Sequence, residues 1–302
     1  MKRFSMWHTI AVCATVTLLA GCGGSRSQIG ASGAMPSMPM AAPAVAARQS
    51  PPDSSALPSA AGPNLYVGNI TDDVTVYAPG SAKPLRTIST SAHALAVRSG
   101  NLYVAKANGV VLYLRIYKNG KTLIRIIKKG LRGPVAMAFG SSGNLFVANI
   151  SGSNVTAYAP SSGTLLRTIS NGVDNSRALG FDASGDLYVG NQRSVTIYAP
   201  SMGRPLRTIT FVHELLSLAL DTSGDLYVGT THDVLVYAKI GTKLLRSVPA
   251  GFAYALAFDG SGNLYVANEL FNTVTVYAPN SDKLLQTISK GVTEPRALAF
   301  GP

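Results

Sequence analysis

From about residue 63 to the last residue given, apolar and polar residues alternate in short segments rich in β-branched and aromatic side chains. One stretch, "NLYVGNITDDVTVYAPGSAKPLRTIS" at residues 64–89, is nearly repeated as "NLYVANELFNTVTVYAPNSDKLLQTIS" at residues 263–289. Alternation with a period of two residues predicts strands, whereas a helical period of 3.6 residues extends over no useful length. The pattern therefore predicts an all-β domain made of repeats.

A four-residue motif, Asn/Asp-Leu-Tyr/Phe-Val, marks each repeat. Successive copies are separated by 37, 43, 42, 39 and 38 residues. The six copies begin at Asn64, Asn101, Asn144, Asp186, Asp225 and Asn263. A period near 40 residues with four strand-like segments in each copy is typical of the blades of a β-propeller. We therefore predict a six-bladed β-propeller with four-stranded blades over residues 63–302.

The two ends of this domain complement each other. The first copy opens at Asn64 with the second strand of a blade, and "RALAFGP" at residues 296–302 supplies a first strand without a blade of its own. Pairing the two completes the sixth blade in a 3+1 closure and protects edges that an open sheet would expose. By the same reasoning, charges on the outermost strands should discourage pairing with other chains; a binding role is the alternative. Those charges belong to Arg86, Arg167, Arg207 and Arg246.

Turn residues support the predicted strands. Three copies contain "FDASGD", "LDTSGD" or "FDGSGN", at residues 181–186, 220–225 and 258–263. The Asp side chain can accept a hydrogen bond from the backbone N–H two residues later, and Gly supplies the positive φ that ends such a loop. These segments therefore predict the turns between the first and second strands of three blades.

The amino terminus predicts an exported protein. Lys2 and Arg3 precede the apolar run "TIAVCATVTLLA", and "LAGC" ends at Cys22. The run is shorter than the about 20 apolar residues that a membrane-spanning helix needs, and small residues before a cysteine resemble a bacterial lipobox. We predict a signal peptide over residues 1–21 and a lipid on Cys22; an ordinary secretory signal or a buried apolar segment is the alternative. The residue after Cys22 is Gly23 and not Asp, which resembles lipoproteins that are sent to an outer membrane, if the host has one.

Residues 22–62 predict a disordered tether. This segment is rich in Ala, Pro, Ser and Met and has a period of neither 2 nor 3.6 residues. Of the two cysteines, only Cys22 would remain in the mature protein, so we expect no disulfide there. The predicted arrangement is a propeller held by a lipid anchor in the cell envelope, clear of the membrane surface.

The repeats also resemble a known group of proteins. The stretch "DGSGNLYVANELFNTVTVYAP" at residues 259–279 is similar to the repeats of NHL and YVTN propellers. It is more distantly similar to calcium-dependent lactonases of the gluconolactonase type. The resemblance covers about residues 63–302 and implies architecture more than activity, because one fold hosts many functions. Propeller lipoproteins with this layout imply a binding or scaffold role in the envelope.

Function in a propeller is expected at one mouth of the central channel, where loops enter the innermost strands and leave the second strands. Positions there that differ from blade to blade are candidates for ligand contact. We call one such set, equivalent across the repeats, the six mouth positions: His93, Val135, Arg177, Leu216, Tyr254 and Arg296. The predicted ligand contacts are His93, Arg177, Tyr254, Arg296, Glu214, Glu294, Asn149 and Asn191. Their chemistry suits an anionic or sugar-like ligand.

Two alternatives stay open for these residues. The asparagines can make Asx turns, and the charged side chains can simply face water. A metal-dependent hydrolase is also conceivable, because Glu and Asn oxygens suit a hard cation such as calcium. Glu214, Glu294, Asn149 and Asn191 could supply some of these oxygens, yet no Asp stands at the strand ends where lactonases tend to have one. The sequence carries no nucleophile elbow, zinc spacing or phosphate-binding glycine loop, so we predict no catalytic residue and no cofactor.

The charge is unevenly distributed. The chain has 26 basic and 14 acidic residues, and no acid stands between Val74 and Val173. The second repeat is strongly basic through Lys106, Arg115, Lys118, Lys121, Arg125, Lys128, Lys129 and Arg132. A segregated charge attracts anions, and for an exported protein these would be an acidic glycan, a glycolipid, an envelope protein or lipid headgroups rather than nucleic acid.

Overall fold

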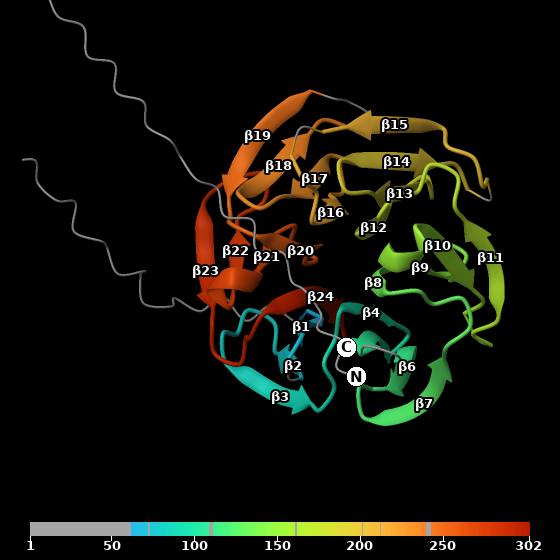
Figure 1. The fold of residues 1–302 in the computed structure, drawn as a ribbon. Coiled ribbons are helices and arrows are strands. Elements are labelled where there is room, and N and C mark those ends of the chain that lie inside the picture. Colours follow the sequence, from blue (N-terminus) through green and yellow to red (C-terminus); the bar gives the residue numbers. More distant parts are fainter. Residues whose placement is uncertain are drawn as a thin grey trace, which may run out of the picture. The chain divides into compact units, whose positions relative to one another are not determined.

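The computed structural model describes residues 62–302, apart from residues 72, 109–110, 161, 201, 212 and 240–242. Six four-stranded antiparallel sheets are arranged around a central axis (Figure 1). The prediction of an all-β, six-bladed propeller is therefore confirmed. Within the described residues the helical content consists of two 3-10 turns, η1 (Ile150–Gly152) and η2 (Glu269–Phe271). None of the helices in this part of the chain is long and apolar enough to cross a membrane.

The predicted signal peptide, Cys22 and all of the predicted tether except residue 62 lie outside the described residues.

The blades follow one another in chain order. The strands of each blade are named here in their spatial order, from the innermost strand at the central channel to the outermost strand. Blade 1 contains β24 (Pro295–Gly301), β1 (Asn64–Asn69), β2 (Val74–Tyr77) and β3 (Pro84–Ile88). Blade 2 contains β4 (Ala94–Arg98), β5 (Asn101–Asn108), β6 (Val111–Lys118) and β7 (Thr122–Ile127). Blade 3 contains β8 (Pro134–Phe139), β9 (Leu145–Asn149), β10 (Asn154–Tyr158) and β11 (Leu165–Ile169).

The remaining blades repeat this order. Blade 4 contains β12 (Ala178–Phe181), β13 (Leu187–Gly190), β14 (Ser194–Tyr198) and β15 (Arg207–Thr210). Blade 5 contains β16 (Ser217–Leu220), β17 (Leu226–Gly229), β18 (Asp233–Tyr237) and β19 (Leu244–Pro249). Blade 6 contains β20 (Ala253–Phe258), β21 (Leu264–Asn268), β22 (Thr273–Tyr277) and β23 (Leu284–Ile288).

The ring closes in blade 1, where β24 pairs with β1. The register places Leu65 opposite Phe300 and Val67 opposite Leu298. The Tyr66 hydroxyl also donates a hydrogen bond of 2.7 Å to the carbonyl oxygen of Pro302. This is the 3+1 closure that the two ends of the domain predict, and it pairs the inner edge of β1 that would otherwise be open.

The Asp-Gly turns form as predicted. In the turn between β12 and β13, Asp182 Oδ1 accepts hydrogen bonds from the backbone N–H groups of Ser184 and Asp186, both at 2.9 Å. Gly185 has a φ of 83°, a region that favours glycine. The equivalent aspartates of blades 5 and 6 accept the same two hydrogen bonds.

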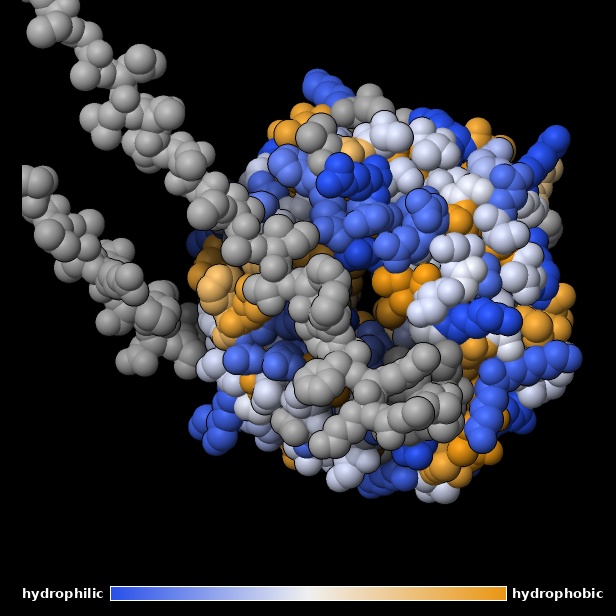
Figure 2. Space-filling model, in the orientation of Figure 1, coloured by the Kyte–Doolittle hydropathy of each residue, from blue (hydrophilic) through white to orange (hydrophobic). Residues whose placement is uncertain are grey.

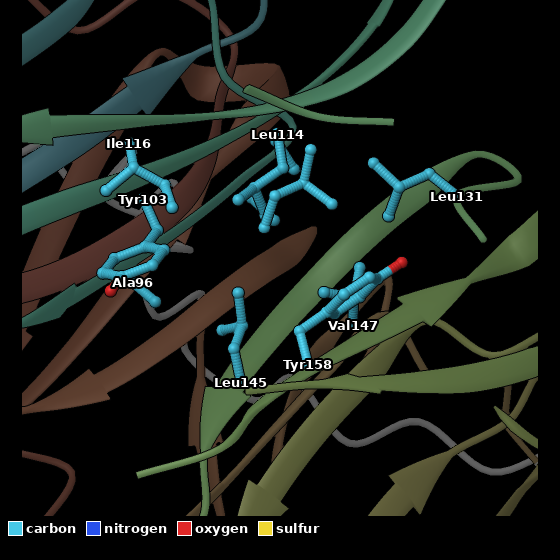
Figure 3. Packing of buried hydrophobic residues seen from close by; sticks show 11 residues of the cluster. Ala96, Tyr103, Leu114, Ile116, Leu131, Leu145, Val147 and Tyr158 are labelled. Atoms are coloured by element: carbon cyan, nitrogen blue, oxygen red, sulfur yellow. The ribbon is translucent and has the colours of Figure 1, made fainter. Parts of the chain in front are cut away.

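The core is divided into layers between neighbouring blades. Figure 3 shows the layer between blades 2 and 3, where Tyr103 and Leu114 of one blade face Leu145 and Tyr158 of the next. The second strand of every blade carries a small residue that lets the innermost strand of the following blade approach closely. These residues are Gly68, Ala105, Ala148, Gly190, Gly229 and Ala267. A Cβ on Gly68 would lie 2.9 Å from the Cβ of Ala92, so the spacing between these blades depends on glycine.

Four tyrosines on the third strands hold the loops that lead into the innermost strands. The Tyr158 hydroxyl donates to the carbonyl oxygen of Lys129 at 2.7 Å, and the Tyr198 hydroxyl donates to that of Asn171 at 2.6 Å. Tyr77 and Tyr277 make the equivalent bonds in blades 1 and 6. Each of these four loops is thereby fixed to the blade that follows it.

Three of the four outer-strand arginines are directed across their own blades. Arg246 donates to the Tyr227 hydroxyl at 2.6 Å, and the Arg167 guanidinium lies 5.6 Å from the Phe146 ring. Arg86 contacts Tyr66 in the same way. The reason is a β-bulge in the outermost strand just before each of these three arginines, which changes the side-chain alternation. The same bulge precedes Arg125 in β7 and Gln286 in β23.

Candidate functional site

All six mouth positions line one cavity. Each stands at or next to the start of an innermost strand, and together with Ile150 they enclose a volume of about 170 Å³. The innermost strands surround the axis in Figure 1, and Figure 2 shows the surface hollowed near the centre of the ring. A second cavity of about 90 Å³ adjoins it among the inner strands and shares Val135, Arg177, Tyr254 and Arg296 with it. The mouth is therefore a small cup that continues into the channel.

Both arginines of the mouth are paired with carboxylates. Arg177 Nη2 lies 2.7 Å from Glu214 Oε1, and their side chains are 21% and 37% exposed. Arg296 forms an ion pair with Glu269, whose side chain is only 10% exposed. The Nε atom of Arg177 is buried and has no hydrogen-bond partner within the described residues.

Glu269 belongs to the candidate site through its ion pair with Arg296, and sequence reasoning missed it. It begins η2, directly after Asn268 at the end of β21, and its carboxylate meets Arg296 from blade 1. A signal was present, since the residue after each second-strand end varies from blade to blade. The equivalent residues are Ile70, Ala107, Ile150, Gln192, Thr231 and Glu269.

Tyr254 and His93 complete the polar side of the cup. The Arg296 guanidinium carbon lies 4.9 Å from the centroid of the Tyr254 ring. Burial raises the pKa of Tyr254, and the Glu269 carboxylate raises it further against the opposing influence of Arg296. Burial lowers the pKa of His93 below its ordinary value, and the positive charges of Arg296 and Lys106 lower it further. At neutral pH His93 is therefore an uncharged imidazole among cations.

Asn149 and Asn191 lie outside the cavity lining. Asn149 is fully buried; its Oδ1 accepts the backbone N–H of Arg132 at 2.9 Å, and its Nδ2 donates to Thr156 at 3.0 Å. Asn191 makes the matching bonds to Asp174 and Thr196. The amides are thus engaged in holding the loops that lead into the innermost strands. This placement fits the structural alternative for the asparagines.

The two predicted glutamates occupy different surroundings. Glu214 pairs with Arg177 at the cavity edge, whereas Glu294 is exposed on the rim with a φ of 46°. Gly133, Asn175 and Phe252, at the equivalent position of other blades, share this left-handed backbone. The residue type at this position therefore differs between these blades, while the backbone keeps the same left-handed turn. The candidate oxygens for a cation do not converge, and within the described part of the chain no three His, Cys, Asp or Glu side chains are grouped to hold a metal ion.

The basic residues of blade 2 are divided between the two faces of the ring. The second and fourth strands end on the mouth side, so Lys106, Lys128, Lys129 and Arg132 belong to that side. Lys118 and Lys121 flank the turn between β6 and β7 on the opposite side. Arg115 and Arg125 lie within strands β6 and β7. The eight residues therefore surround one blade and do not form a single flat patch.

Comparison with known proteins supports the fold. No protein-family model matches the sequence, and no curated protein matches it. A protein of unknown function from Bacteroides caccae is 14% identical with a TM-score of 0.64, covering 79% of this chain and 98% of its own. A functionally unknown protein from Desulfotomaculum acetoxidans is 14% identical with a TM-score of 0.58, covering 79% of this chain and 88% of its own. At this identity the likeness shows a shared fold alone.

Proposed function

We propose that this protein is a binding module of the cell envelope whose mouth holds the acidic terminal group of a small ligand or glycan. The observation that carries the proposal is the convergence of the six mouth positions on one cavity that contains Arg177 and Arg296. Positions that vary between otherwise similar blades are lined up where a ligand would sit. The blades supply the scaffold, and the mouth supplies the specificity.

Guanidinium groups favour a carboxylate or phosphate as the ligand. Arginine presents a planar fork of donors that matches two acceptor oxygens. The Arg177 side chain is 21% exposed and lines the cavity, so an acidic group placed there could contact its guanidinium. Tyr254 and its covering arginine add a flat wall beside it.

The size of the cup limits the ligand. Sites for drug-sized molecules usually enclose roughly 300–1,000 Å³, whereas this cavity encloses about 170 Å³. It fits one terminal residue of a longer molecule. Glu214 and Glu269 pair with the two arginines, so an acidic ligand group would compete with these carboxylates for the guanidinium groups.

Binding is favoured over a metal-dependent hydrolysis. The oxygens that a lactonase-like cation site would need are engaged elsewhere: two amides hold loops, and Glu214 pairs with Arg177. The residues present therefore do not fit the calcium site of such enzymes. We propose no catalytic residue and no cofactor.

The proposal includes an envelope location. The sequence of residues 1–22 supports removal of a signal peptide and lipidation of Cys22, and the repeats are similar to NHL and YVTN propellers of envelope proteins. In cells, Cys22→Ser should abolish the incorporation of labelled fatty acid into the protein. Unchanged incorporation would contradict the lipid anchor.

Calorimetric titration of the full chain with glucuronate and with glucose tests the mouth. Glucuronate should bind and glucose should not. Arg177→Gln should weaken glucuronate binding about ten-fold or more, because a hydrogen bond to a charged group contributes about 1.5–3 kcal/mol. Arg204→Gln removes the same charge from an exposed loop between β14 and β15 and serves as the matched control. Equal affinities of the two variants, or equal affinities for the two sugars, would contradict the proposal.

A further inference from the structure

The outermost strand of blade 2 exposes an unusual amount of aliphatic surface. Leu123, Ile124 and Ile126 are 44%, 51% and 45% exposed, and all three belong to the six-residue strand β7. We call these three side chains the β7 patch. The described parts of the other outermost strands each expose no more than two large aliphatic side chains, as β19 does with Leu244 and Leu245. Figure 2 shows hydrophobic surface on the rim over β7, with hydrophilic residues beside it.

A β-bulge explains how consecutive side chains come to face outward. Tyr117 of β6 pairs with Leu123, but Ile116 pairs with Arg125, so Ile124 is the extra residue. The bulge places Leu123 and Ile124 together on the outer surface. It also interrupts the edge of β7, and bulged edges are poor templates for adding another strand. A peptide added as a fifth strand is therefore disfavoured as the occupant of this edge.

Basic side chains stand at both ends of the β7 patch. Lys118 and Lys121 lie before β7, Lys128 and Lys129 follow it, and all four are exposed. No acidic residue stands between Val74 and Val173. The strands of blades 2 and 3 that belong to this stretch therefore carry no carboxylate that could neutralise the lysines. Exposed aliphatic groups flanked by lysines combine the two attractions that hold proteins on anionic bilayers. Lysine side chains can extend to headgroup phosphates while the aliphatic side chains enter the lipid boundary.

We propose that the β7 patch and its four flanking lysines form a seat on an anionic lipid surface. The contact would hold blade 2 against the headgroups and turn the mouth sideways to the membrane plane. It is independent of the ligand bound at the mouth, since it uses the outer rim of the ring. It also differs from the proposed acyl anchor, because it fixes the orientation of the domain as well as its distance.

A tryptophan placed in the β7 patch reports lipid contact at that site. The full chain carrying Trp7→Phe and Cys22→Ser has no other tryptophan and no acylated cysteine. Ile124→Trp in this background is compared with Leu245→Trp on β19, which stands at the equivalent bulged position of blade 5 and is similarly exposed, at 47%. Figure 1 shows β7 and β19 on opposite sides of the ring.

Vesicles of phosphatidylcholine with and without phosphatidylglycerol are the probes. On anionic vesicles the emission of the Ile124→Trp variant should shift to shorter wavelength and be quenched by brominated lipid, while that of Leu245→Trp should not. Adding Lys128→Glu and Lys129→Glu should weaken vesicle binding by about ten-fold or more, and salt should weaken it further. Absence of a shift at position 124, or the same shift at both positions, would overturn the proposal. An unchanged shift after the two lysine reversals would overturn it as well.

Discussion

The guanidinium of Arg296 covers the ring of Tyr254 at 4.9 Å, so a cation from β24 of blade 1 contacts an aromatic side chain from β20 of blade 6. Glu269 of blade 6 pairs with the same guanidinium. This polar cluster of the mouth is thus assembled beside the strand that closes the ring. The position of Arg296 in the mouth therefore depends on the pairing of β24 in blade 1.

Arg296→Gln should destabilise the protein more than Glu269→Gln. Loss of one partner of a buried ion pair costs about 3–5 kcal/mol. Because the Arg296 side chain is 34% exposed, we expect about 2 kcal/mol for its removal, which leaves a carboxylate of 10% exposure without its partner. Glu269→Gln should cost about 1 kcal/mol or less, since the arginine can still reach water. Urea unfolding measures both, and the reverse order would show that the carboxylate does not depend on this pair.

His93 should make stability fall as the solution becomes acidic. Its folded-state pKa is lowered by burial and by Arg296 and Lys106, so the unfolded chain takes up a proton first as the pH falls through about 6.5. The contribution is present above that pH and is lost below it. Thermal midpoints from neutral to mildly acidic pH should therefore drop, and His93→Gln should flatten the drop. An equally steep drop in His93→Gln would assign it to other groups.

Tyr198 should make stability fall at alkaline pH. Burial raises the pKa of Tyr198 from 10.0 to about 12. Between these values the unfolded chain loses the phenolic proton and the folded protein keeps it, so stability decreases as the pH rises. Tyr198→Phe should cost about 1–2 kcal/mol at neutral pH, because the Asn171 carbonyl loses its donor, and should reduce the alkaline decrease. Urea unfolding at neutral and alkaline pH separates the two effects; a pH dependence identical to that of the native chain would contradict the assignment.

Gly229→Ala should strain the contact between blades 5 and 6. The added Cβ would lie 2.5 Å from the backbone oxygen of Ala253 and 2.2 Å from Ser217 Oγ. Overpacking of this kind costs about 1–3 kcal/mol, and a backbone atom cannot move aside as a side chain does. Gly203→Ala is the control, since no atom lies within 4 Å of its Cβ position. Equal thermal midpoints of the two variants would contradict the tight approach of these blades.

Calcium should leave the thermal midpoint unchanged. Saturating a site present only in the folded state, at 100 times its dissociation constant, would add about 2.7 kcal/mol. The candidate oxygens are held in loop contacts or pair with arginine, so we expect no such gain. Differential scanning fluorimetry of the metal-stripped full chain with millimolar calcium, and with magnesium as a control, measures it. A calcium-specific rise that Glu214→Gln abolishes would return the hydrolase to consideration.

The repeats explain why so much of the architecture could be predicted. Six copies of one motif fix the strand order within each blade, and alignment of the copies transfers a position from one blade to all others. Alignment alone therefore assigns His93, Arg177, Tyr254 and Arg296 to the same mouth of the channel. The Asp-Gly turns followed from local chemistry, since an Asx turn depends on residues only a few positions apart.

Contacts between blades could not be predicted in the same way. The partner of Arg296 is Glu269, from the neighbouring blade, and nothing in the local sequence joins them. The orientation of Arg246 and its equivalents depended on bulges that leave no clear composition signal. Asn149 and Asn191 were ambiguous because an amide serves a ligand or a loop equally well, and only their burial separates the two.

Closure of the ring by β24 has a consequence for the order in which the blades can be completed during synthesis. Tyr66 and Pro302 are joined by a hydrogen bond although 236 residues separate them, whereas blades 2 to 6 each use consecutive strands. A chain emerging from a ribosome could build those blades in turn, yet blade 1 would wait for the last strand. The finished ring forms only after that strand has emerged, so synthesis of the domain precedes closure. A chain cut short before Pro295 would leave β1 unsealed and open to proteolysis.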